Sequence, residues 1–341
     1  MVGVGKSFAV VIPTANRRSF VCEAIERALS QTLPPAEVIV VDDGSADDTV
    51  DTIGERFPDH VYLIKQAKDG VQAARNRGIL AAKAEWTALL DDDDLWDINY
   101  LERASTFLCK APETQALFTS FRVCEADKIV LPNKFRSAPI EFWNISGGRK
   151  VGDDGLSAKF PIENTFDYQP FFPSTTIIHR DLLRTAGGYD LKLRGVKGED
   201  YEFTFRVLLG ATCGFLMDAG ATVRKHGAND SANSKLLTIG ELQILDFIKQ
   251  VHWQKISSEA RPLLDQAIKT KLHSALDAAF TLANPAMVRS FARRIENSLT
   301  WNERLKFAIS QLPFGVAPRV MKHLDSVGTL RSQIKKGDMS R

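Results

Sequence analysis

Four consecutive carboxylates follow an apolar run in the segment "WTALLDDDDLW". They are Asp91, Asp92, Asp93 and Asp94, and they stand where a buried segment reaches the surface. Burying like charges this close together without a partner costs several kcal/mol or forces protonation. A divalent cation would compensate the run, and carboxylate oxygens are the ligands that Mg²⁺ and Mn²⁺ prefer. We therefore expect one of these two metals, bound through one or two carboxylates and the phosphates of a substrate.

Other polar residues follow apolar runs nearer the N-terminus. Thr14 follows residues 8–13, and Asp42 and Asp43 follow residues 37–41. A segment with helical spacing, residues 19–32, separates the two runs, which predicts βαβ units and a mostly parallel sheet in an α/β protein. Parallel sheets bind ligands at the carboxyl ends of their strands. These residues and the aspartate run should therefore meet at one edge of the sheet.

The distribution of charged residues predicts two domains of opposite net charge. Residues 1–235 hold 28 basic against 33 acidic residues, whereas residues 236–341 hold 16 against 9. We expect an α/β domain over residues 1–235 and a helical region over residues 236–341, opened by a capping box from Thr238 to Glu241. Within the α/β domain, further strands are expected at 61–65, 86–90, 116–121, 174–180 and 214–218, a helix near 200–209, and a long irregular loop at 126–165.

The cysteines and the hydropathy pattern indicate a protein that stays inside the cell. The four cysteines form no C-x-x-C pair and no metal-type spacing, which is typical of reduced thiols in the cytosol. No segment resembles a signal peptide, and no apolar run approaches the roughly 18 residues that span a bilayer. We therefore expect a cytoplasmic location.

Five segments in order resemble the family 2 glycosyltransferases, which adopt the GT-A fold. They are "VVIPTANR" (10–17), "VVDDGSADDT" (40–49), "GVQAARNRG" (70–78), "LLDDDD" (89–94) and "GED" (198–200). The resemblance covers residues 8 to about 230. It implies transfer of a sugar from a nucleotide donor, UDP foremost, to a saccharide or lipid-linked saccharide in polysaccharide or glycolipid assembly. Nucleic acid is not among the expected partners.

The resemblance implies a nucleotide site made of Pro13, Thr14, Asp42 and Arg75, with Asp91 and Asp92 beside it. A carboxylate at Asp42 can accept a strong hydrogen bond from the ring N–H of a pyrimidine base. Arg75 is expected near the nucleotide, in contact with Asp42 or with the base. As an alternative, Asp42 or Asp43 caps a turn before the following helix, and for Asp43 the two readings are about equally favoured.

The same resemblance assigns the metal to Asp93, with Asp94 in reserve and His226 as a further ligand or a diphosphate contact. Side chains alternate along a strand, so Asp91 and Asp93 are expected to face one side while Asp92 turns away. The fourth acid leaves the register of the metal ligand ambiguous by one residue. For His226 a purely structural role is an equal alternative, since a lone histidine is usually structural.

The resemblance also places the catalytic base at Asp200, with Glu199 beside it to orient the acceptor. A general base there would take the proton of the acceptor hydroxyl, and a single in-line displacement would invert the anomeric centre. The alternative is that both acids stabilise the dipole of a helix that starts here, by about 0.3–1 kcal/mol.

Two other functions and two roles for the C-terminus stay open. A nucleotidyltransferase of related fold should carry a Gly-rich basic loop after the first strand, but "TANRRSF" has no glycine. A catalytically silent nucleotide- or carbohydrate-binding module is the second alternative. Residues 316–341 are basic, and Val320, Leu324, Val327 and Leu330 recur at helical spacing. This stripe could pack on the protein or lie on an anionic membrane at the inner face of the plasma membrane.

Overall fold

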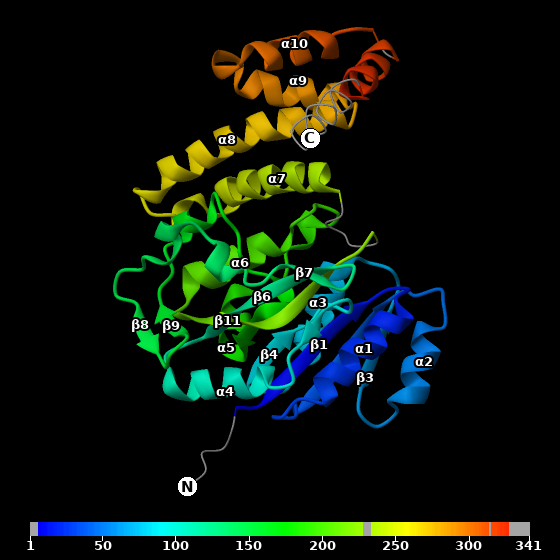
Figure 1. Ribbon diagram of the computed structural model, residues 1–341, viewed down its shortest axis with the longest axis vertical. Helices are drawn as coiled ribbons and strands as arrows, with labels where there is room; N and C mark the ends of the chain where they lie inside the picture. The colour runs from blue at the N-terminus through cyan, green and yellow to red at the C-terminus, as the bar shows by residue number, and fades with distance from the viewer. Residues whose placement is uncertain (1–5, 228–232, 314, 327–341) are drawn as a thin grey trace, which may run out of the picture. The chain divides into compact units, whose positions relative to one another are not determined.

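The computed structural model describes residues 6–227, 233–313 and 315–326, and the chain forms two compact units (Figure 1). The first, here called the α/β unit, comprises Met1–Gly195 and Glu199–Asn229. The second, the helical unit, comprises Val196–Gly198 and Asp230–Arg341.

One mixed sheet organises the α/β unit. Its strand order is β3-β2-β1-β4-β10-β6-β11-β9-β8, with β5 paired to β11 and β7 paired to β6. The pairs β1–β2, β2–β3, β1–β4 and β6–β11 are parallel, whereas β10 runs antiparallel to both β4 and β6. The strands are β1 (Phe8–Thr14), β2 (Glu37–Asp43), β3 (Tyr62–Gln66), β4 (Trp86–Leu89), β5 (Leu95–Trp96), β6 (Ala116–Glu125), β7 (Lys128–Leu131), β8 (Arg149–Val151), β9 (Gly155–Ala158), β10 (Thr176–His179) and β11 (Cys213–Lys225).

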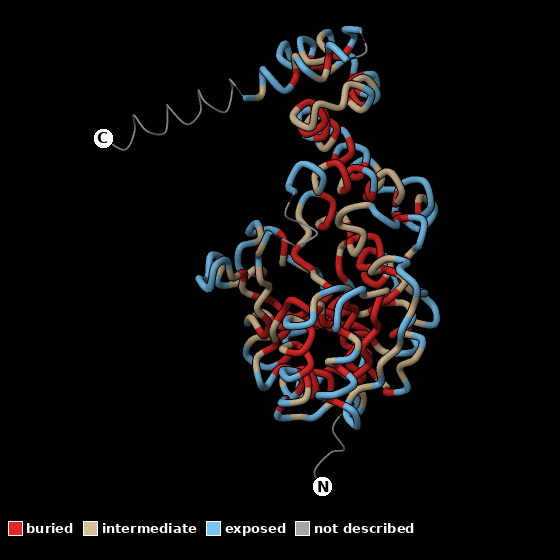
Figure 2. Tube along the Cα trace, turned by 90° about the vertical axis from the view of Figure 1, so that its right-hand side faces the viewer, coloured by how far each residue is buried: buried red, intermediate tan, exposed pale blue. Residues whose placement is uncertain are grey.

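Helices cover both faces of this sheet, so its central strands are apolar on both sides. Val10 and Ile12 of β1 belong to the core that also contains Val21 and Ile25 of α1. On the opposite face, Val11 lies against Gly78 of α3. Figure 2 shows these buried segments gathered in the interior of the unit. The expected mostly parallel α/β sheet flanked by helices is confirmed.

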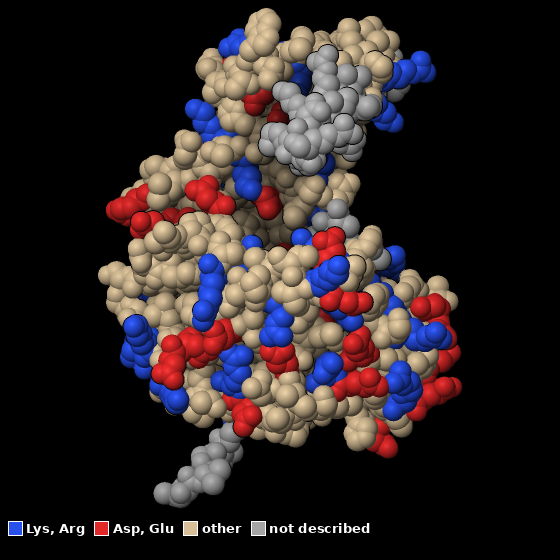
Figure 3. Space-filling view, viewed as in Figure 1, with Lys and Arg blue, Asp and Glu red and all other residues tan. Residues whose placement is uncertain are grey.

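The helices of the α/β unit are α1 (Arg18–Leu29), α2 (Thr49–Arg56), α3 (Val71–Ala81), α4 (Tyr100–Lys110), α5 (Arg180–Ala186) and α6 (Asp200–Gly210). Acidic and basic side chains lie intermixed over the face of this unit that Figure 3 shows.

The segment 126–165 is more regular than expected. It contains the short strands β7, β8 and β9, and β9 pairs with β11 inside the sheet. The prediction of one long irregular loop was therefore wrong. Strands of three or four residues are too short to show a periodic pattern, and glycines such as Gly152, at φ +66°, close the turns between them.

The helical unit consists of α7 (Ser234–His252), α8 (Ala260–Thr281), α9 (Pro285–Arg294) and α10 (Trp301–Ser310), and residues 316–326 are also helical. Asn233 caps α7 by accepting hydrogen bonds from the backbone N–H groups of Lys235 and Leu236. The expected capping box at Thr238 was wrong, because the helix begins four residues earlier. Val327 and Leu330 of the predicted basic stripe lie outside the described residues. Across the described chain, no helix is both long and apolar enough to cross a membrane.

Candidate functional site

The aspartate run forms a turn instead of continuing strand β4. The strand ends at Leu89, and the backbone N–H of Asp94 donates to the carbonyl oxygen of Asp91 at 3.2 Å. Strand alternation therefore does not apply here. The expectation that Asp92 turns away from Asp93 was wrong, because these two carboxylates share one partner, Arg17, while Asp91 pairs with Arg75.

Arg17 joins Asp92 to Asp93. Its Nη1 lies 2.9 Å from Oδ1 of Asp92 and 2.8 Å from Oδ2 of Asp93. Thr14, at the end of β1, donates its hydroxyl to Oδ2 of Asp92 at 2.7 Å. Burial raises the pKa of Asp92 to about 6, although Arg17 and Thr14 both favour its charged form.

His226 lies directly after β11 and reaches the same aspartate. Its Nε2 is 3.1 Å from Oδ2 of Asp93. Its ring stacks on Phe20 of α1, with 4.8 Å between ring centroids and 15° between planes. The guanidinium of Arg224 lies over Phe20 as well, 4.9 Å from the ring centroid. Helix α1 therefore fixes the orientation of the imidazole that points at Asp93.

Asp93 and His226 fit a metal site that a substrate would complete. In the described part of the chain, no three carboxylate, imidazole or thiol side chains form a ready-made metal cluster. However, Mg²⁺ and Mn²⁺ are commonly bound through one or two protein ligands together with substrate phosphates. The carboxylate of Asp93 and the imidazole of His226 lie side by side and can provide these two protein ligands.

Asp94 faces the protein interior and is poorly placed as a reserve ligand. Its side chain is buried, accepts a hydrogen bond from Oγ of Ser174 at 2.5 Å, and accepts another from the backbone N–H of Arg224 at 3.1 Å. Burial, together with the neighbouring Asp93 and Asp91, raises the pKa of Asp94 well above its usual range. We infer that Asp94 fixes the turn, since Ser174 also accepts a hydrogen bond from the N–H of Asp91.

Arg75 connects the aspartate run to the second acidic pair. Its Nη2 lies 2.7 Å from Oδ1 of Asp91, and its Nη1 lies 3.1 Å from Oε1 of Glu199. The guanidinium also lies over the ring of Tyr189, 5.1 Å from the centroid. The expected contact between Arg75 and Asp42 was wrong, because both ion pairs of Arg75 go to other acids.

Asn76, the neighbour of Arg75, holds Tyr189 in place. Its side-chain amide donates to the carbonyl oxygen of Tyr189 at 2.9 Å and accepts from the backbone N–H of Tyr189 at 2.7 Å. This pair of hydrogen bonds ties the loop before α6 to helix α3.

Asp42 and Asp43, the last two residues of β2, bind two different loops. Asp42 accepts hydrogen bonds from the hydroxyl and the backbone N–H of Ser45. Asp43 accepts from the backbone N–H groups of Asp69 and Gly70, at 2.7 and 2.9 Å. The turn-capping alternative therefore describes Asp42, whereas Asp43 holds the loop between β3 and α3 instead of the turn that follows β2. Pro13 and Thr14 end β1, directly beside Val41 and Asp42 in the sheet register.

Asp200 begins helix α6 and lies close to several other acids. Burial, together with the neighbouring Glu199 and Asp91, raises its pKa to about 7, and Arg75 opposes the shift. Burial likewise raises the pKa of Glu199. A carboxyl that titrates near neutral pH is suited to accept a proton under cellular conditions.

Sequence reasoning missed Arg17, Ser174 and Tyr189. Arg17 stands three residues after Thr14, behind a strand whose carboxyl end was already identified as functional, so a wider search at that strand end would have found it. Ser174 and Tyr189 carry no local signal, because each acts through a residue far away in the sequence.

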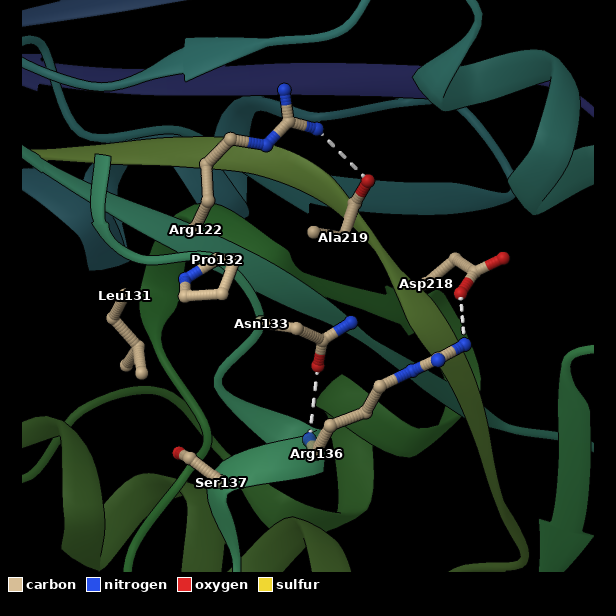
Figure 4. Close-up of a pocket in the computed structure, with 8 residues that line it drawn as sticks. All are labelled: Arg122, Leu131, Pro132, Asn133, Arg136, Ser137, Asp218 and Ala219. Carbon is tan, nitrogen blue, oxygen red and sulfur yellow. Dashed lines mark hydrogen bonds and ion pairs between the residues drawn. The ribbon is translucent and has the colours of Figure 1, made fainter. Parts of the chain in front are cut away.

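The α/β unit also contains a pocket of about 640 Å³ (Figure 4). Its charges are largely paired: Arg136 binds Asp218 at 2.6 Å, and Arg122 binds Asp97. It offers little net charge to an anionic diphosphate, so we do not place the nucleotide there. It is lined by Arg122, Leu131, Pro132, Asn133, Arg136, Ser137, Asp218 and Ala219, none of which was a predicted site residue.

Comparison with known sequences finds a family match over the first part of the α/β unit. Residues 9–158 match the model of "Glycosyl transferase family 2". One relative is UDP-Glc:alpha-D-GlcNAc-diphosphoundecaprenol beta-1,3-glucosyltransferase WfaP of Escherichia coli. The two sequences are 32% identical over 133 residues, and the aligned segment covers 38% of this chain and 51% of WfaP. The chain is 29% identical over 134 residues to the putative teichuronic acid biosynthesis glycosyltransferase TuaG of Bacillus subtilis, covering 38% and 52%. The chain thus spans about half the length of these two relatives.

Solved structures show the same fold. The Staphylococcus aureus TarS fragment 1–349 matches with a TM-score of 0.56 at 18% identity, covering 94% of this chain and 92% of that one. Mannosyltransferase PcManGT from Pyrobaculum calidifontis, solved in complex with GDP-Man and Mn²⁺, matches with a TM-score of 0.56 at 17% identity, covering 95% and 88%. The GT-A fold is thereby confirmed. Residues 9–158 of this chain therefore form a domain of glycosyl transferase family 2.

Proposed function

We propose that this protein is a metal-dependent, inverting glycosyltransferase that moves a sugar from a nucleotide donor, UDP foremost, to an acceptor hydroxyl. The observation that carries the proposal is Asp200, a partly buried carboxyl with a pKa of about 7, next to an ion-pair network that leads to the aspartate run. Family membership and the GT-A fold support it.

Asp200 is the proposed general base. As a carboxylate it takes the proton of the acceptor hydroxyl as that oxygen attacks the anomeric carbon, for a gain of typically about 10²–10⁴ in rate. Attack from the side opposite the leaving diphosphate inverts the anomeric centre, and no covalent intermediate is needed. Glu199, held by Arg75, helps to orient the acceptor.

Arg75 keeps the acids of the site in position. It neutralises Asp91 and Glu199 while Asp200 retains its high pKa, since the ion pairs of the guanidinium go to the other two carboxylates. Asp91 and Asp92 lie on the nucleotide side of the proposed site. Asp42, Pro13 and Thr14 form the proposed base pocket, and GDP- or dTDP-sugars are the alternatives that also offer a ring N–H to Asp42.

Asp93 and His226 are the proposed metal ligands. Mn²⁺ or Mg²⁺ held there would supply positive charge that neutralises the negative charge building on the leaving diphosphate. The Mn²⁺ in the PcManGT complex supports a divalent metal in this fold. Phe20 keeps the His226 ring directed at Asp93.

The proposed acceptor is a saccharide or a lipid-linked saccharide in polysaccharide or glycolipid assembly. The names of WfaP and TuaG, a diphosphoundecaprenol glucosyltransferase and a putative teichuronic acid biosynthesis enzyme, support this class. We further propose a peripheral contact with an anionic membrane through the helical unit, where Trp301 and Leu305, one turn apart on α10, are 80% and 53% exposed. The alternative is that the C-terminal helices make no membrane contact and that the apolar stripe with Val320 and Leu324 packs on the protein.

Release of UDP tests the proposal most directly. We expect the protein with Mn²⁺ to hydrolyse at least one UDP-sugar slowly, and to release UDP faster once a suitable acceptor is added. An NMR spectrum of the product should show an anomeric configuration opposite to that of the donor. Binding of UDP with metal but no release from any nucleotide sugar would favour a silent binding module, and retention of configuration would exclude the inverting mechanism.

A further inference from the structure

Arg17 places a positive charge where the proposed metal would have to bind. Its Nη1 donates to Asp92 at 2.9 Å and to Asp93 at 2.8 Å. The two carboxylates are only 5% and 9% exposed, and the arginine side chain is 25% exposed. Without this charge, Asp92 and Asp93 would lie buried next to each other and to two further aspartates, which is strongly unfavourable.

Local backbone structure directs Arg17 to this position. Asn16 adopts a left-handed conformation, with φ at 54°, and Arg17 is the N-cap residue of α1. The side-chain oxygen of Asn16 accepts a hydrogen bond from the backbone N–H of Ala46 at 2.7 Å. The backbone N–H of Asn16 donates to Oγ of Ser45 at 2.8 Å. The loops after β1 and β2 therefore hold the start of α1 against the aspartate run.

The same oxygen of Asp93 serves both Arg17 and His226. Oδ2 accepts from Nη1 of Arg17 and lies 3.1 Å from Nε2 of His226. A cation between Asp93 and His226 would need the lone pairs of this oxygen, and it would be repelled by the adjacent guanidinium. Arg17 and a divalent metal therefore compete for one carboxylate oxygen.

We propose that Arg17 is the resident counter-cation of the aspartate run and yields Asp93 to the metal when a nucleoside diphosphate binds. This inference rests on the proposed metal-dependent transfer. Arg17 keeps Asp92 and gains a new acceptor, because a guanidinium binds phosphate oxygens as readily as carboxylates. Metal alone should therefore bind weakly, and the diphosphate should strengthen its binding by accepting the released guanidinium as well as by adding metal ligands.

The test compares the full-length protein with Arg17→Gln and with a matched control, Arg18→Gln. The control removes the same charge from the next residue, whose surface ion pair with Asp48 has side chains 54% and 57% exposed. Mn²⁺ affinity is measured by electron paramagnetic resonance without and with UDP. Without UDP, we expect Arg17→Gln to bind Mn²⁺ about tenfold or more tightly than wild type, and Arg18→Gln to match wild type. UDP should strengthen Mn²⁺ binding less in Arg17→Gln than in the other two proteins.

Equal or weaker Mn²⁺ binding by Arg17→Gln without UDP would overturn the inference and leave the metal site intact. Absence of Mn²⁺ binding in all three proteins, even with UDP, would remove the proposed metal site and the inference together. If Arg17→Gln does not fold, the Mn²⁺ affinity of Arg17→Lys tests the inference instead. This variant keeps the charge but loses the guanidinium fork, so we expect it to bind Mn²⁺ about threefold or more tightly than wild type. Wild-type affinity in Arg17→Lys would mean that the arginine is only structural.

Discussion

Asp200 lies in the first turn of α6, yet its pKa is raised. It opens α6, where the helix dipole favours the charged form by about 0.3–1 kcal/mol, yet burial and two neighbouring acids raise its pKa to about 7. Burial therefore outweighs the dipole. A residue that only stabilised the helix would show the opposite shift, which is why we favour the catalytic role.

Asp200→Asn separates the two roles. We expect the variant to fold, to keep UDP and Mn²⁺ affinity within about twofold, and to lose transfer by about 10²–10⁴, because an amide cannot accept the hydroxyl proton. Steady-state rates of UDP release with acceptor provide the measurement. Asp181→Asn is the control, since Asp181 also lies in the first turn of a helix, α5, with a side chain that is 62% exposed. Near-normal transfer by Asp200→Asn would refute its assignment as the base.

The pKa of Asp200 also predicts a pH dependence of the rate. The base acts only when it has lost its proton, so transfer should rise with pH up to about pH 7 and then level off. A rate profile between pH 5.5 and 8.5, run at saturating donor and metal, checks this. A rate that stays constant between pH 5.5 and 8 would mean that no group with this pKa controls the reaction.

The same pKa predicts a pH dependence of stability with the opposite direction. In the unfolded chain an aspartate loses its proton near pH 4, whereas folded Asp200 keeps it until about pH 7. Asp200 therefore makes its full contribution to the free energy of unfolding below about pH 4. This contribution is lost as the pH rises towards 7. In EDTA, thermal unfolding should occur at a lower temperature at pH 8 than at pH 6, and this difference should shrink in Asp200→Asn. If the unfolding temperatures of wild type and Asp200→Asn differed by the same amount at pH 6 and pH 8, the raised pKa of Asp200 would be contradicted.

At the scale of elements, close packing of α3 on the sheet positions Arg75 and Asn76. A Cβ atom at Gly78 would lie 2.3 Å from Cγ1 of Val11 and 3.3 Å from Cγ2 of Val41, so this helix can approach β1 and β2 only with glycine there. Arg75, one turn earlier on the same helix, then reaches Asp91 and Glu199. The backbone distance between helix and sheet therefore determines the geometry of the ion-pair network.

Gly78→Ala should destabilise the protein by about 1–3 kcal/mol through overpacking, and should lower transfer by displacing Arg75. Gly54→Ala is the control, because Gly54 is exposed in α2 with no atom within 4 Å of the added Cβ. That change should stabilise the protein by about 0.5–1 kcal/mol, since alanine favours helix. Urea unfolding measures both. Equal free energies of unfolding for the two variants would show that the close approach of α3 carries no constraint.

At the scale of the whole molecule, the charge of the aspartate run should make nucleotide binding depend on metal. Arg17 brings one positive charge to the two carboxylates of Asp92 and Asp93, so a diphosphate is still repelled when no metal is bound. We therefore expect UDP affinity to fall by about tenfold or more in EDTA. Titration calorimetry with Mn²⁺ and with EDTA measures this. Uridine, which has no phosphate, is the control and should bind alike in both conditions. Equal UDP affinity in both would remove the metal from the proposed function.

The helical unit supplies a second test at this scale. If Trp301 and Leu305 contact an anionic membrane, the double variant Trp301→Ala/Leu305→Ala should sediment with phosphatidylglycerol vesicles about tenfold less than wild type, because two apolar side chains no longer insert. Ile140→Ala is the control, since Ile140 is 91% exposed on the α/β unit. Unchanged sedimentation of the double variant would exclude a membrane contact through these two side chains.

The elements could largely be predicted from the sequence. Apolar runs such as residues 8–13 and 37–41 became β1 and β2, and residues 19–32 contain α1, because period and burial are local properties of the chain. The short strands between residues 126 and 165 could not be predicted. β7 pairs with β6, β9 pairs with β11, and β8 pairs with β9. Each of the three is too short to show a period, and β11 is distant from β9 in the sequence.

The sequence by itself determined which residues carry charge at the strand ends and, through five motifs in order, the resemblance to family 2 glycosyltransferases and the expected fold. Only the tertiary structure decided which partner each acid has. Arg75 reaches Glu199, 124 residues away, instead of Asp42, and Arg17 joins Asp92 to Asp93. The physical reason is the turn after Leu89: once the chain leaves the strand, side-chain direction no longer follows alternation. The direction of each side chain instead depends on its charge, because a buried charge needs a partner among the groups that folding brings close.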